Sequence, residues 1–78
     1  MTQKLDAFIE RLRPIVTEIE GRVPTTRGHY GDYLTILTTF ATDRVQANVL
    51  ANILIAAGAN ERGVTDALRV SFLDELRA

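Results

Sequence analysis

The stretch DRVQANVLANILIAAGAN, Asp43 to Asn60, carries a start signal, an apolar body and a stop signal for one helix. Asp43 followed by Gln46 matches a capping box, in which two side chains satisfy amide groups at the beginning of a helix. Gly58 supplies the left-handed residue that commonly ends a helix. The stretch therefore predicts a helix from Asp43 to Ala57.

The apolar surface of this helix is wide. At about 100° per residue its apolar side chains occupy about 280° of the circumference, whereas a surface helix facing one core needs a stripe of about 100°. After the first turn only Asn48 and Asn52 interrupt that surface. From Tyr33 to Asn60 the only charged residues are Asp43 and Arg44. A helix of this kind must be covered on nearly every side.

The length of the chain limits how much of this apolar helix the rest of the chain can cover. The chain has 78 residues and no cysteine, which places it near the lower size limit for a fold without disulfides or metals. Three short companion helices cover about two sides of a fourth, and oligomerisation is a usual route to a sufficient core. We therefore expect a homodimer whose interface includes Val49, Leu50, Ile53 and Leu54. A central core helix in a monomer is the alternative.

Composition sets the class of protein. With 46% hydrophobic residues, 24% charged residues and a formal net charge of −1, the chain is typical of a soluble globular domain. It shows neither a signal peptide nor an apolar stretch able to span a membrane. We expect one helical domain over residues 1–78, located in the cytoplasm, with no cofactor and no membrane partner.

A first helix is predicted near the amino end. Apolar residues recur there at three- and four-residue spacing, with Thr2 as the N-cap and Gly21 as the stop. Pro14 lies inside this segment and predicts a bend or a break, because proline removes one helical hydrogen bond. The expected single buried face comprises Leu5, Phe8, Ile9, Leu12, Ile15, Val16 and Ile19.

Two further segments complete the fold. DYLTILTTFAT, Asp32 to Thr42, has some character of a strand, but a helical wheel separates its threonines from its apolar residues, with Asp32 as the N-cap. The apolar side is Tyr33, Leu34, Ile36, Leu37, Phe40 and Ala41. After Gly58, either Asn60 or Thr65 caps a last helix. The sequence thus predicts an all-α, small four-helix bundle-like domain with short loops and one Gly/Pro-rich loop.

That Gly/Pro-rich loop, GRVPTTRGHYGDY from Gly21 to Tyr33, is the first candidate for a functional site. It has no serine or cysteine nucleophile nearby, the chain has no second histidine, and the glycine spacing fits neither phosphate-binding loop. We predict no catalytic and no metal site. Glycines 28 and 31 are expected to form turns, and His29 is expected to be hydrated, so that His29→Ala changes stability little. Candidate contacts for a partner are Arg22, Arg27, His29 and Tyr30.

The second candidate is NILIAAGANERGVTDALRV, Asn52 to Val70. With Gly58 at the turn and Val64 six positions later, it resembles the helix-turn-helix of DNA-binding regulators. The resemblance implies that the last helix is presented to DNA through Arg62, Thr65 and Arg69. The net charge of −1 argues against this function, since DNA binding draws most of its affinity from phosphate neutralisation.

The sequence therefore predicts a non-enzymatic protein–protein interaction module, a homodimer that binds another, unidentified protein. The alternative is a small dimeric helix-turn-helix-like DNA-binding regulator, and nucleic acid is the disfavoured partner.

Overall fold

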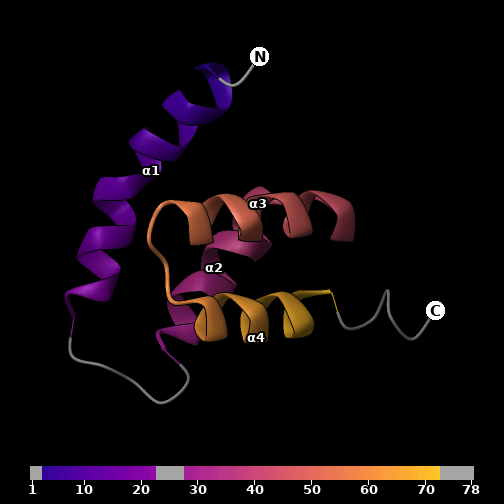
Figure 1. Cartoon of the computed structure of the whole chain (residues 1–78). Helices are drawn as coiled ribbons and strands as arrows, with labels where there is room; N and C mark the ends of the chain where they lie inside the picture. Colours follow the sequence, from indigo (N-terminus) through magenta and orange to yellow (C-terminus); the bar gives the residue numbers. More distant parts are fainter. Residues whose placement is uncertain (1–2, 23–27, 73–78) are drawn as a thin grey trace.

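The computed structural model describes residues 3–22 and 28–72, and these residues form four helices and no strand. The helices are α1 (Gln3–Glu20), α2 (Tyr30–Phe40), α3 (Arg44–Ala56) and α4 (Glu61–Ser71). In Figure 1, α2, α3 and α4 pack together. The carboxyl end of α1 lies beside them, and its amino end projects away. The all-α prediction is confirmed.

The beginning of α3 is fixed by side chains close in sequence. Asp43 Oδ1 accepts a hydrogen bond from the Gln46 backbone N–H at 2.9 Å, as the capping box predicts. Gln46 Oε1 reaches one residue further back than expected and accepts from the Thr42 N–H at 2.9 Å and the Thr42 hydroxyl at 2.7 Å. Together these bonds separate α3 from α2 and confirm the predicted start.

The turn between α3 and α4 is a Schellman motif. Gly58 has a φ of 109°, its N–H donates to the Ile55 carbonyl at 3.0 Å, and the Ala59 N–H donates to the Leu54 carbonyl at 3.0 Å. Asn60 then caps α4 by accepting from the Gly63 N–H at 3.0 Å. This short turn sends α4 back alongside α3, and the two helices run in opposite directions in Figure 1.

The core lies where these helices meet the carboxyl end of α1. The most extensive helix contact is between α2 and α4. Small side chains, including Ala51 and Ala67, are buried in the cluster and let the helix backbones approach each other. The largest fully buried side chains are Val16, Tyr33, Leu37, Leu54 and Val64.

Helix α1 departs from its predicted burial. Val16 and Ile19 enter the core, but Leu5, Phe8 and Ile15 are exposed. The expectation of one buried face along the whole helix is therefore wrong for its amino half, because that end of α1 projects away from the other helices (Figure 1) and only Ile9 there packs against the core. α1 does not break at Pro14, although its axis changes direction partway along its length. The predicted cap Thr2 lies outside the described residues.

Helix α2 begins three residues earlier than predicted. His29, in a left-handed conformation with φ 63°, is the N-cap residue, and its side chain makes no capping hydrogen bond. Asp32, the expected cap, lies in the first turn, where its charge favours the helix dipole. Gly28 forms the turn with φ 53°, but Gly31 lies inside the helix instead of in a turn.

Phe40 was expected on the buried side of α2 but is 71% exposed. It is the last residue of the helix. Leu37, three residues earlier, is fully buried, so the cover given by the neighbouring helices ends between Leu37 and Phe40.

The molecule is flat. Its principal extents are 35 × 35 × 17 Å, and a helix with side chains is about 10 Å across. A domain about two helix layers thick cannot enclose a helix on all sides. The wide apolar surface of α3 is for this reason only partly covered within the chain.

Candidate functional site

The outer side of α3 is an apolar surface that the described residues leave largely uncovered. Ala51 and Leu54 point into the core and are buried. Val45 and Val49, on the opposite side, are 73% and 55% exposed. Leu50 lies between these extremes and is half-buried. The helix therefore carries more apolar surface than its neighbours cover.

Residues from three helices join Val45 and Val49 around one hollow of about 300 Å³. Phe8 comes from α1 and is 41% exposed, and Phe40 comes from the end of α2. We call this region the apolar hollow. It is lined by Phe8, Phe40, Val45, Gln46, Val49, Leu50 and Ile53, none of which carries a charge.

The predicted interface residues divide between this hollow and the core. Val49, Leu50 and Ile53 line the hollow. Leu54 is fully buried inside its own chain and offers no surface to a second subunit. Phe8 and Phe40 were expected on the apolar sides of their own helices and not at the interface, because their proximity to α3 depends on how α1 and α2 pack.

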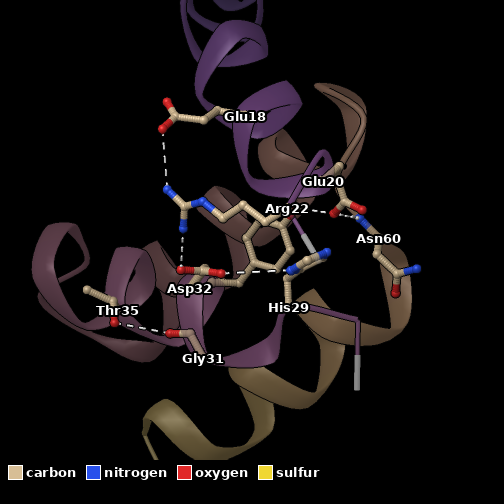
Figure 2. Close-up of polar contacts among 9 residues, drawn as sticks. Glu18, Glu20, Arg22, His29, Gly31, Asp32, Thr35 and Asn60 are labelled. Atoms are coloured by element: carbon tan, nitrogen blue, oxygen red, sulfur yellow. Dashed lines mark hydrogen bonds and ion pairs between the residues drawn. The ribbon is translucent and has the colours of Figure 1, made fainter. Parts of the chain in front are cut away.

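A polar junction ties α1, α2 and α4 together, as Figure 2 shows. Glu20, the last residue of α1, accepts hydrogen bonds at Oε2 from the Tyr33 hydroxyl and, at 2.8 Å, from the Asn60 backbone N–H. The pKa of Tyr33 is raised above its usual value. The largest cause is burial of the phenol, and the hydrogen bond to the Glu20 carboxylate and the negative charge of that carboxylate add to it. A methyl group at Gly28 would lie 2.4 Å from Asn60 Oδ1, so glycine is required there by space as well as by φ.

His29 belongs to this junction. It is only 4% exposed, and its Nδ1 lies 3.9 Å from Asp32 Oδ2. The expectation of a hydrated imidazole is wrong, because two successive left-handed residues, Gly28 and His29, turn the ring into the space between the helices. Asp32 Oδ1 also accepts from Arg22 at 2.9 Å, and Arg22 reaches Glu18 at 3.5 Å.

The four loop residues predicted to contact a partner differ in their exposure and in their contacts. Arg22 is exposed but engaged in two ion pairs, His29 is buried, and Tyr30 packs partly against the core. Arg27 lies outside the described residues. Tyr33 and Asn60 donate to the Glu20 carboxylate and Arg22 donates to Asp32, which is the arrangement of a structural joint. Among residues 3–22 and 28–72, no three His, Asp or Glu side chains are grouped as a metal site would require.

The candidate nucleic-acid residues are also separated by the structure. Thr65 and Arg69 line a groove of about 510 Å³ between α3 and α4, together with Arg44 and Asn48, whereas Arg62 is not part of its lining. The sequence did not indicate Arg44 and Asn48 as members of a site. They lie on α3, and only the antiparallel packing brings them to the end of α4.

Comparison of the chain with protein-family models, with curated proteins and with solved structures gave no match. In the part of the chain that the structure describes, no helix combines the length and apolarity needed to cross a membrane.

Proposed function

We propose that this protein is a non-enzymatic helical interaction module that acts as a homodimer, with the apolar hollow as the dimer interface. The observation that carries the proposal is the gathering of Phe8, Phe40, Val45 and Val49 around one uncharged hollow, each between 41% and 73% exposed. Apolar surface of this kind, contributed by three helices, is typical of an interaction site.

A second copy of the chain fits this surface. In a two-fold dimer the same patch lies on both sides of the interface, so a protruding group and a hollow on one surface can complement each other. Phe40 protrudes beside the hollow, whose volume of about 300 Å³ exceeds the roughly 150 Å³ that accepts a benzene ring. Each Phe40 ring can therefore enter the hollow of the partner.

Charge does not oppose this pairing. The lining contains no ionised side chain that would have to be stripped of water, and a net charge of −1 leaves little repulsion between two copies. Small size adds a reason, since a 78-residue chain gains a larger core by association.

The test is the molar mass measured by light scattering during size exclusion, on the wild type and two matched variants. Val49→Glu should be monomeric but folded, because the residue is exposed in the single chain and a carboxylate in a desolvated interface costs several kcal/mol. Val70→Glu makes the same change at an exposed valine of α4 outside the hollow and should stay dimeric.

A monomeric wild type would contradict the proposal. So would dimers of equal stability in both variants, since the interface would then lie elsewhere.

The second candidate function, a DNA-binding regulator, is favoured only by the exposure of Thr65 and Arg69 beside Arg44. Binding of a DNA duplex at low salt that is lost on adding salt would support it. In that case Arg62→Ala and Arg69→Ala should each weaken binding by about 1–3 kcal/mol. We expect no specific binding to be found.

The cytoplasmic location and a further protein partner stay predictions.

A further inference from the structure

A second groove lies between the beginning of α3 and the end of α4, which the antiparallel course of these helices places side by side (Figure 1). Its volume is about 510 Å³. Arg44 and Asn48 contribute from α3, and Thr65 and Arg69 contribute from α4, with Val45 and Leu68 completing the lining. Among residues 3–22 and 28–72, two cations line this groove and no lining residue is acidic.

Few carboxylates of the described residues pair with the positive charge of this groove. Within residues 3–22 and 28–72 Arg44 forms no ion pair, and the partner of Arg69 is Asp66 at 3.9 Å, a long contact. A bound anion would supply acceptors for both guanidinium groups.

We propose that this groove binds a small phosphate monoester that has an apolar body. A phosphate monoester carries a charge of about −1.5 to −2 near neutral pH, which matches two guanidinium groups, whereas a carboxylate matches only one. The planar guanidinium forks suit phosphate oxygens, and the Asn48 amide and the Thr65 hydroxyl supply further donors.

The remaining lining accounts for the apolar body of the ligand. Val45 and Leu68 offer apolar contacts beside the polar groups, an arrangement common in small-molecule sites. The groove volume falls in the range of about 300–1,000 Å³ found for such sites.

This inference does not depend on the proposed dimer. Val45 borders both hollows, but none of the four polar residues lines the apolar hollow. Loss of ligand binding and loss of dimerisation can therefore be observed separately.

The experiment is a titration of the full chain with phenyl phosphate, followed by backbone amide chemical shifts. We expect saturable shifts centred on the groove. Arg44→Gln and Arg69→Gln should each raise the dissociation constant by about tenfold or more, the loss expected for a charge-assisted hydrogen bond. Arg62→Gln, which removes another α4 arginine outside the groove, should leave it unchanged. Inorganic phosphate, which lacks the ring, and benzoate, which has one charge, should both bind more weakly.

Several results would overturn the proposal. One is the absence of saturation by phenyl phosphate at millimolar concentration. Another is an equal loss of affinity in Arg62→Gln, which would indicate general surface attraction. Benzoate binding as tightly as phenyl phosphate would remove the phosphate preference. Duplex DNA binding that all three arginine variants weaken alike would assign this surface to a nucleic-acid backbone instead.

Discussion

Tyr33 joins three parts of the chain through one hydroxyl group. Its ring is fully buried, and its hydroxyl donates to Glu20 at the end of α1. The same carboxylate oxygen accepts from the Asn60 N–H at the start of α4. Removing the hydroxyl leaves that carboxylate with one donor fewer in a partly buried place, so the phenol should matter for stability and for its pH dependence.

Tyr33→Phe should lower the free energy of unfolding by about 1–2 kcal/mol at neutral pH. The raised pKa of Tyr33 keeps the phenol protonated in the folded protein at a pH where the unfolded chain ionises, at about 10 and above. The stability from Tyr33 is thus fully present below that pH and is lost as the pH rises further. Urea unfolding between neutral and alkaline pH should show a steeper alkaline decline for the wild type than for Tyr33→Phe. Parallel curves would contradict this role.

His29→Ala should lower the free energy of unfolding by about 1–2 kcal/mol, because the imidazole is packed inside the junction. Gly31→Ala is the control on the same segment. It lies in α2 with no atom within 4 Å of an added methyl group, and should raise stability by about 0.5–1 kcal/mol. Thermal unfolding of both variants checks the pair, and an unchanged melting temperature in His29→Ala would show that the ring contributes nothing.

At the scale of elements, α3 is the helix whose limits depend most clearly on single side chains. Asp43→Ala removes the acceptor for the Gln46 N–H and should cost about 0.5–2 kcal/mol. Asp43→Ser keeps an N-cap acceptor and should lower the free energy of unfolding by only a few tenths of a kcal/mol. Equal unfolding midpoints in urea for the two variants would show that the cap does not stabilise the helix.

The sequence could predict features that depend on contacts between residues close together in the chain, but not features that depend on contacts between different helices. The cap at Asp43 and the stop at Gly58 depend on bonds to residues within five positions, so the pattern predicted them correctly. For α4 the same local pattern gave Asn60 as one of two possible caps, and Asn60 is the cap observed. The burial of His29 and the exposure of Phe40 depend on where other helices lie. No local pattern contains that information, and the groove that pairs Arg44 with Arg69 escaped prediction for the same reason.

At the scale of the molecule, the thickness of 17 Å leaves α3 covered on one side and open on the other. Leu54→Glu therefore tests the position of the core, and Val49→Glu tests the dimer interface. Leu54 is fully buried, so its variant should lose helical circular dichroism and unfold. Val49→Glu should keep its helical signal and lose only the dimer. A folded Leu54→Glu variant would contradict the position of the core.

The central claim is that the apolar hollow of one copy holds Phe40 of another. The direct measurement is an isotope-filtered nuclear Overhauser experiment on a mixture of labelled and unlabelled chains, which detects only contacts between copies. We predict cross-peaks between the Phe40 ring of one chain and the methyl groups of Val45 and Val49 of the other. Dimers that show cross-peaks elsewhere but none from Phe40 to these valines, or a mixture without any intermolecular cross-peak at millimolar concentration, would contradict the account.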